Sequence, residues 1–183
     1  QDEGSQLLAL MLDAKRGEMV VDFCAGAGGK TLAIGASMRS TGRLYAFDVS
    51  GHRLEALKPR LARSGLSNVH PAAIAHERDD RVKRLAGKID RVLVDAPCSG
   101  LGTLRRNPDL KWRQSAKAIE ELTQKQAAIL ASAARLVTSA GSTPWRISAK
   151  AALFFWAFAI WAGKAAIRAA SRASGARVSN ASR

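Results

Sequence analysis

The chain has 183 residues, 47% of them hydrophobic, which suits a single domain with a substantial buried core. Its net charge of +14 favours a polyanionic partner, and its two cysteines form no Cys-x-x-Cys pair, which argues against a zinc site and a disulfide framework. We therefore expect a protein without a metal, in a reducing, cytoplasmic setting. At the start of the chain, residues 1–4 are polar and acidic rather than a signal peptide, and the missing Met predicts a fragment or a processed piece.

The first predicted strand, 19–23, leads into a glycine-rich stretch, 24–31, and then into a helix around 32–36. Such a turn lets the backbone approach a ligand closely, and the helix N-terminus adds N–H donors for an anionic group. A tight turn without a ligand is the competing interpretation. A Walker-type phosphate loop would need glycine at Cys24, and the dinucleotide pattern GxGxxG would need glycine at Thr31, so both are disfavoured.

The second predicted strand, 43–48, alternates apolar and polar residues and ends in Asp48. An acid at this point can accept hydrogen bonds from a ribose diol. Asp48 could instead cap the next helix, but Ser50 is the better cap. We expect that helix to kink or restart at Pro59 and to end at Gly65. The two elements together predict a site for a nucleoside cofactor.

The third and fourth predicted strands are 69–74 and 89–94, and the fourth runs into Asp-Ala-Pro-Cys-Ser-Gly. Ligands of an open parallel sheet lie beyond the carboxyl ends of its strands, so we expect Asp22, Asp48 and Asp95 to meet there.

Cys98 lies just beyond the fourth strand, in a turn rich in Pro and Gly. There it would be exposed to the cleft and nucleophilic if nearby cations stabilised its thiolate. A small buried cysteine is the alternative.

A basic segment, 102–113, follows. Its Arg105, Arg106, Lys111 and Arg113 offer phosphate contacts, and Trp112 offers a stacking face, as in single-stranded RNA binding. A solvated basic loop is the alternative. The next helix, 115–137, is expected to pack on the sheet.

The composition changes after Val137. Residues 138–183 hold 7 of the 29 Lys and Arg, none of the 15 Asp and Glu, and three of the four Trp. We therefore predict two parts: an α/β domain over 1–137, and an Ala/Ser/Arg-rich tail over 138–183. The apolar run 151–163 is shorter than the roughly 20 residues of a membrane-spanning helix, so a buried or adhesive helix is favoured over a membrane contact.

The chain resembles the bacterial Sun (Fmu) family of ribosomal-RNA cytosine-5 methyltransferases in four segments: DFCAGAGGKT, AFDVS, VLVDAPCSGLGTLRRNPDLKW and ELTQKQAAIL. The resemblance covers residues 1–137. It implies a seven-stranded, Rossmann-like α/β fold, S-adenosyl-L-methionine (SAM) as the cofactor, and methylation of a cytosine C5 in small-subunit ribosomal RNA.

The resemblance also implies roles for residues. The methionine end of SAM would be held by Cys24, Ala25, Gly26, Ala27, Gly28, Gly29 and Lys30. Asp48 would hold the ribose, and Asp95 would lie beside the methyl donor and the target base. An acid after the third strand would contact adenine, and within 76–79 the choice stays open. RNA would be bound by Arg105, Arg106, Lys111 and Trp112.

The expected chemistry needs a cysteine, because a thiolate must add to C6 before C5 can take the methyl group. In the family the nucleophile lies in a Thr-Cys-Ser motif after the fifth strand, and the cysteine matching Cys98 assists product release. This chain has no cysteine after Cys98, and because the core begins almost at residue 1 we expect the family's N-terminal RNA-binding domain to be absent.

We therefore expect a core truncated after the fourth strand and its helix, and a catalytically incomplete methyltransferase. The alternatives are a non-catalytic SAM- or RNA-binding module and a non-functional gene fragment. We hypothesise that residues 138–183 are a frameshift product, since frameshifts in GC-rich genes give acid-free tails of this kind.

Overall fold

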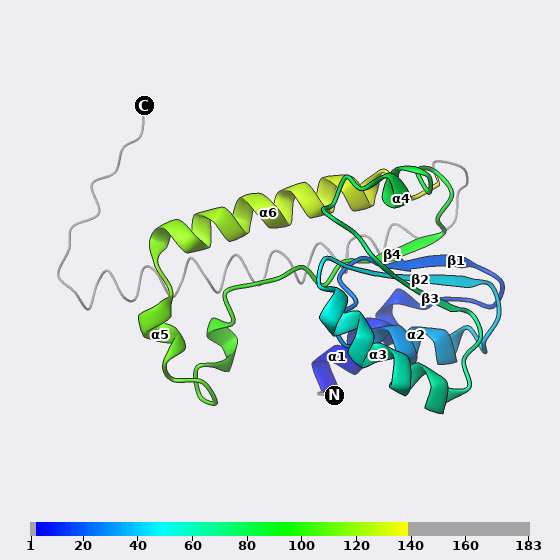
Figure 1. Cartoon of the computed structure of the whole chain (residues 1–183), viewed down its shortest axis with the longest axis horizontal. Helices are drawn as coiled ribbons and strands as arrows, with labels where there is room; N and C mark the ends of the chain where they lie inside the picture. Colours follow the sequence, from blue (N-terminus) through cyan, green and yellow to red (C-terminus); the bar gives the residue numbers. More distant parts are fainter. Residues whose placement is uncertain (1–2, 139–183) are drawn as a thin grey trace.

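The structure is a computed structural model that describes residues 3–138 (Figure 1). Its helices and strands are α1 (Glu3–Leu12), β1 (Met19–Asp22), α2 (Gly29–Ser37), β2 (Arg43–Asp48), α3 (Gly51–Ser64), β3 (Val69–Ala73), α4 (Asp80–Lys83), β4 (Arg91–Leu93), the 3-10 helix η1 (Leu101–Thr103), α5 (Leu110–Arg113) and α6 (Ala116–Ala134). The four strands form one parallel sheet in the order β3-β2-β1-β4. This is the predicted Rossmann-like α/β arrangement.

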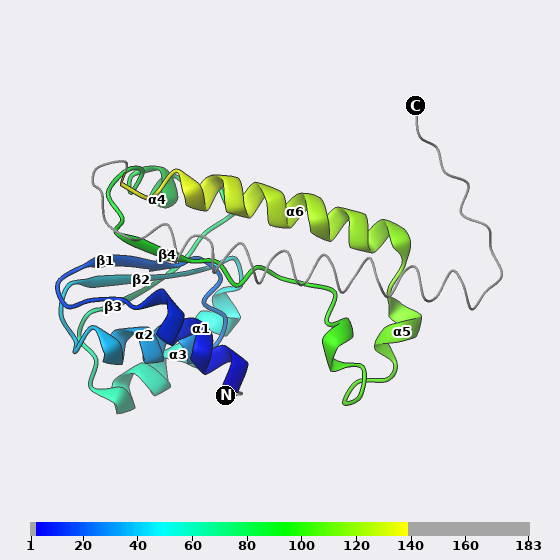
Figure 2. The same ribbon diagram turned by 180° about the vertical axis from the view of Figure 1, so that it is seen from behind.

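The sheet has a helical layer on each face (Figures 1 and 2). Successive side chains of a strand point to opposite faces, so each inner strand serves two cores. Val20 of β1 packs with α1, α2 and α3, whereas Val21 packs with α4 and α6. Strands buried on both faces read as continuous apolar runs, which is why β1 could be recognised in the sequence.

The helix α3 shows which local predictions hold. Ser50 caps it by accepting a hydrogen bond from the backbone N–H of Arg53, and Gly65 ends it in the left-handed conformation, both as predicted. The predicted restart at Pro59 is wrong, because α3 runs through this residue. Two buried leucines, Leu54 and Leu57, hold the helix on the sheet, so packing outweighs the loss of one backbone donor.

Beside β4, the chain that leaves α6 begins a further parallel pairing. Val137 bridges Ile89, and the backbone N–H of Thr138 donates to the Ile89 carbonyl over 3.0 Å. The described residues end there, so the tail and the apolar run 151–163 lie outside them. Within residues 3–138 no helix is both long and apolar enough to cross a membrane, and no cluster of metal-ligating side chains is found.

Candidate functional site

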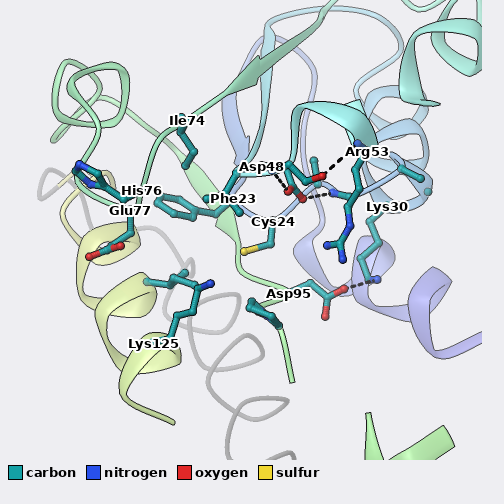
Figure 3. Close-up of a pocket in the computed structure, with 18 of the residues that line it drawn as sticks. Phe23, Cys24, Lys30, Asp48, Arg53, Ile74, His76, Glu77, Asp95 and Lys125 are labelled. Carbon is teal, nitrogen blue, oxygen red and sulfur yellow. Dashed lines mark hydrogen bonds and ion pairs between the residues drawn. The ribbon is translucent and has the colours of Figure 1, made fainter. Parts of the chain in front are cut away.

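A cavity of about 690 Å³ opens beyond the carboxyl ends of the strands, where the sequence placed a ligand site (Figure 3). Nine residues were predicted to bind the cofactor, and eight of them line this cavity: Cys24, Ala25, Gly26, Ala27, Gly29, Lys30, Asp48 and Asp95. Gly28 is the exception. Two segments contribute to the wall: the glycine loop (24–30), and the Cys98 loop (95–100) through Asp95 and Pro97.

Gly28 serves the packing of the glycine loop. It caps α2 with φ +83°, a conformation that disfavours other residues. A Cβ atom at this position would lie 2.1 Å from Cδ1 of Leu57, which is fully buried in α3. Gly26 also has a positive φ, but the space around it is open. The glycine loop therefore rests on α3 through Gly28 and faces the cavity with its other residues.

Asp48 is bound to the glycine loop as well as to its own turn. Its Oδ2 accepts a hydrogen bond from the Gly26 backbone N–H, and its Oδ1 accepts one from the Ser50 N–H, each over 2.8 Å. The side chain is buried but still lines the cavity. A carboxylate oxygen has two lone pairs, so each oxygen keeps one for the hydroxyl groups of a ligand. This geometry suits recognition of a diol.

Lys30 and Asp95 join the two loops. Their Nζ and Oδ2 atoms lie 2.6 Å apart, and both side chains are partly shielded from solvent. Figure 3 shows this pair at one end of the cavity, with His76 and Glu77 at the other. The charge of Lys30 is thus already balanced in the structure.

Asp22 does not meet Asp48 and Asp95 in the cavity, which corrects the sequence-based expectation. It is 1% exposed beneath the glycine loop, where the Thr31 hydroxyl donates to its Oδ2 over 2.7 Å. Its Oδ1 has no hydrogen-bond partner among the described residues. Burial raises the pKa of Asp22 to about 6, against the opposing effect of the Thr31 bond. Asp22 ends the inner strand β1, and its side chain turns to α2 instead of the ligand space.

The two cysteines have different environments. Cys24 is partly buried in the cavity wall, and burial, with the nearby Asp22 and Asp48, raises the pKa of its thiol to about 12. It is a neutral thiol at physiological pH. Cys98 is exposed, as predicted, but it does not line the cavity, unlike Asp95 and Pro97 of the same loop.

Several cavity residues were missed in the sequence. They are Phe23, Val49, Ser50, Arg53, Ile74, Ala75, Pro97, Lys125 and Ile129, together with Ser5 of α1. The position of Arg53 in the first turn of α3 was a usable signal, because that helix begins at the cavity. Lys125 comes from α6, 30 residues beyond Asp95, and no local pattern indicates that it returns to the site.

Residues 76–79, which follow β3, contain the two acids between which the predicted contact with adenine was left open. Asp79 caps α4, accepting hydrogen bonds from the backbone N–H groups of Ala75 and Arg81, and these bonds lower its pKa. Its carboxylate is therefore engaged in the turn. Glu77 lines the cavity beside His76.

The predicted RNA-binding residues lie apart from the cavity. The segment with η1 and α5 extends away from the sheet, at the N-terminal end of α6 (Figures 1 and 2). Arg105 and Arg106 are exposed. Trp112 is 81% exposed, and the Lys111 ammonium lies 4.7 Å from the centre of its ring. These residues form a basic surface with an aromatic face.

The sheet order and the ligand cavity define a Rossmann-like methyltransferase fold. The structure of NSun6 from Pyrococcus horikoshii, solved with SFG, superimposes with a TM-score of 0.67 at 29% identity, over 77% of this chain and 35% of that one. The chain belongs to the family described as 16S rRNA methyltransferase RsmB/F, whose sequence profile it matches over residues 9–144. The predicted family is confirmed, and the match extends beyond the predicted boundary at residue 137.

Two curated relatives show how much of the family is present. The chain is 41% identical to the probable ribosomal RNA small subunit methyltransferase B of Synechocystis, over 78% of this chain and 32% of that protein. It is 34% identical to the 28S rRNA (cytosine-C(5))-methyltransferase of Mus musculus, over 78% of this chain and 18% of that protein. The chain thus spans a third or less of the length of these two relatives.

Proposed function

We propose that this chain is the SAM-binding part of an enzyme that methylates C5 of a cytosine in small-subunit ribosomal RNA. The observation that carries the proposal is the cavity between the glycine loop and the Cys98 loop, with Asp48 at its centre. The names of the relatives support the substrate: one acts on the small-subunit RNA and another on cytosine C5. SFG, an analogue of SAM, accompanies NSun6, and SAM is the cofactor of the family.

We propose one orientation for SAM in this cavity. We place the ribose diol at Asp48, where each carboxylate oxygen keeps a free lone pair. The methionine end would lie along the glycine loop, beside the N-terminus of α2 and the pair of Lys30 with Asp95. The adenine would then lie toward Glu77, the acid of this turn that lines the cavity, whose carboxylate also lies 3.7 Å from Nε of Arg78.

We also propose that the chain is catalytically incomplete. Addition to C6 needs a thiolate close to the bound base. Cys24 is a neutral thiol among carboxylates, and Cys98 matches, by the family resemblance, the cysteine that assists product release and not the nucleophile. The sequence holds no third cysteine. We propose further that the predicted tail, 138–183, is separate from the family domain beyond residue 144, where the family match ends, and that this part arose by a frameshift. The downstream DNA can test this: a Thr-Cys-Ser codon run should follow in another frame.

The RNA would be recruited by Arg105, Arg106, Lys111 and Trp112. Exposed guanidinium groups suit phosphates, and an exposed indole suits an unpaired base. A ribosomal RNA substrate also fits the cytoplasmic setting that the cysteine content predicts.

Calorimetry with SAM and methyl transfer from labelled SAM to small-subunit ribosomal RNA test the proposal together. We expect the purified chain to bind SAM and to transfer no methyl group. Transfer that disappears in Cys98→Ala would instead make Cys98 the nucleophile. A soluble chain that does not bind SAM would contradict the proposed site, and an insoluble one would favour a non-functional fragment.

A further inference from the structure

The Cys98 loop (95–100) has an unusual means of support. It contains neither helix nor strand, and between Asp95 and Ser99 no backbone group bonds to another backbone group in the described part of the chain. Among the residues that the structure describes, three side chains from elsewhere hold it. Lys30 pairs with Asp95, the Gln126 Nε2 donates to the Pro97 carbonyl over 2.9 Å, and the Gln114 Nε2 donates to the Ser99 carbonyl over 2.9 Å.

Of the side chains that hold the Cys98 loop, Gln126 is notable because it is only 6% exposed. It lies on the buried stripe of α6, three residues before Ile129 and seven before Ala133. A leucine would fill this position without polar groups to satisfy. A buried amide is unfavourable unless it is hydrogen-bonded, and here its donor goes to a loop 29 residues earlier.

We propose that Gln126 and Gln114 are positioning residues that clamp the Cys98 loop. They hold the carbonyls of residues 97 and 99, so Cys98 lies between two fixed points, with Asp95 fixed by Lys30. The clamp sets how the exposed thiol lies relative to the cavity. Its value for catalysis rests on the proposed function, because small displacements of a reacting group are costly. The clamp itself needs neither SAM nor RNA.

A nitroxide spin label on Cys98 reports the motion of the loop. Cys24 is a partly buried thiol with a raised pKa, so labelling at neutral pH is expected at Cys98, and peptide mass spectrometry verifies it. We expect an immobilised spectrum in the parent. Gln126→Leu keeps the volume but removes the donor, and should lose the immobile component at every pH.

Gln126→Glu adds a pH profile that a simple packing role would not produce. The ionised carboxylate cannot donate and repels the Pro97 carbonyl, whereas the protonated acid donates an O–H. Burial raises the pKa of such a carboxyl group. The label should therefore be mobile at high pH and immobile again at lower pH, with the parent unchanged over the same range.

Ser132→Ala is the matched control. Ser132 lies on the same helix and donates to the carbonyl of Glu77, so the variant removes a similar bond from another loop and should leave the Cys98 spectrum unchanged. If Gln126→Leu does not fold, Gln114→Leu decides, because Gln114 lies outside the buried core. The proposal is overturned by an immobile label in Gln114→Leu and Gln126→Leu, by equal mobility in Ser132→Ala, or by mobility of Gln126→Glu that ignores pH.

Discussion

The glycine loop and the Cys98 loop face one cavity but are held in different ways. The glycine loop connects a strand to the helix that follows directly, and its own backbone N–H groups hold it: that of Gly26 donates to the Asp48 carboxylate and that of Ala25 to the Phe47 carbonyl. The Cys98 loop is held by side chains from α2, α6 and Gln114. The first loop is therefore held through its own backbone N–H groups by residues 22 positions later, and the second by side chains that lie 65 positions earlier and up to 29 positions later.

This difference suggests a division of labour between the loops. A cofactor common to many enzymes can be bound by a rigid backbone turn. A loop held by amide side chains can be altered by substitutions outside the loop, at Gln114 or at Gln126 of α6. Variants of each loop should therefore fail in different ways, the first through folding and cofactor affinity and the second through local order.

The largest expected effect is on folding and concerns Gly28. Gly28→Val should lower the free energy of unfolding by about 4 kcal/mol, because a positive φ and a collision with buried Leu57 add together. Gly26→Ala is the control. Its φ is also positive but its surroundings are open, so it should lose only about 1 kcal/mol. Urea unfolding measures both, and equal losses would mean that contact with α3 does not secure the glycine loop.

The next largest effect is on the pH dependence of stability and concerns Asp22, which lies beneath the glycine loop. Its folded-state pKa of about 6 exceeds its ordinary value of 3.8, so the native state binds the proton more tightly than the unfolded state. Stability from this group therefore falls as pH rises from about 4 to 6, by up to about 3 kcal/mol at pH 7. The unfolding free energy of the parent minus that of Asp22→Asn should fall over this window.

Asp80→Asn provides the contrast for this pH experiment. Asp80 is exposed and its pKa is lowered by the bond to Lys83. The stability that this carboxylate contributes is therefore lost as pH falls below the ordinary pKa of an aspartate. The two difference curves should slope in opposite directions. A flat curve for Asp22 would show that its burial does not affect ionisation.

A smaller effect is expected on SAM affinity. Asp48→Ala should weaken binding by about 2 kcal/mol, or roughly 30-fold, through loss of charged hydrogen bonds. Because Asp48 also holds the Gly26 and Ser50 backbone N–H groups, the substitution loosens the glycine loop as well. Calorimetry with SAM measures the loss, and Asp80→Ala, outside the cavity, should bind as the parent does. Unchanged affinity of Asp48→Ala would argue against the ribose position.

The difference between local sequence patterns and contacts made by tertiary packing explains what the sequence could predict. The strands, the Ser50 cap, the Gly65 stop and the cavity position of Asp48 all follow from neighbouring residues, because parallel strands bring their carboxyl ends to one edge. The expectation for Asp22 was wrong because successive side chains of a strand point to opposite faces. Asp22, the last residue of β1, therefore points to α2 and not into the ligand space. Lys125 and Gln126 were missed because α6 returns to the site only through tertiary packing.

The last expected effect concerns the salt dependence of RNA binding at the basic surface of Arg105, Arg106, Lys111 and Trp112. Arg105→Ala with Arg106→Ala should reduce the slope of log K against log salt by about 0.7 for each phosphate of single-stranded RNA that the variant no longer neutralises. Lys111→Ala should weaken binding with little change of slope, since its ammonium lies against the Trp112 ring and supports stacking. Filter binding at several salt concentrations separates the two kinds of interaction.

Trp112→Ala should match Lys111→Ala in slope and lose more affinity, by about 1–3 kcal/mol for one stacked base. Equal slopes in the parent and the double arginine variant would mean that other charges of this basic chain bind the phosphates.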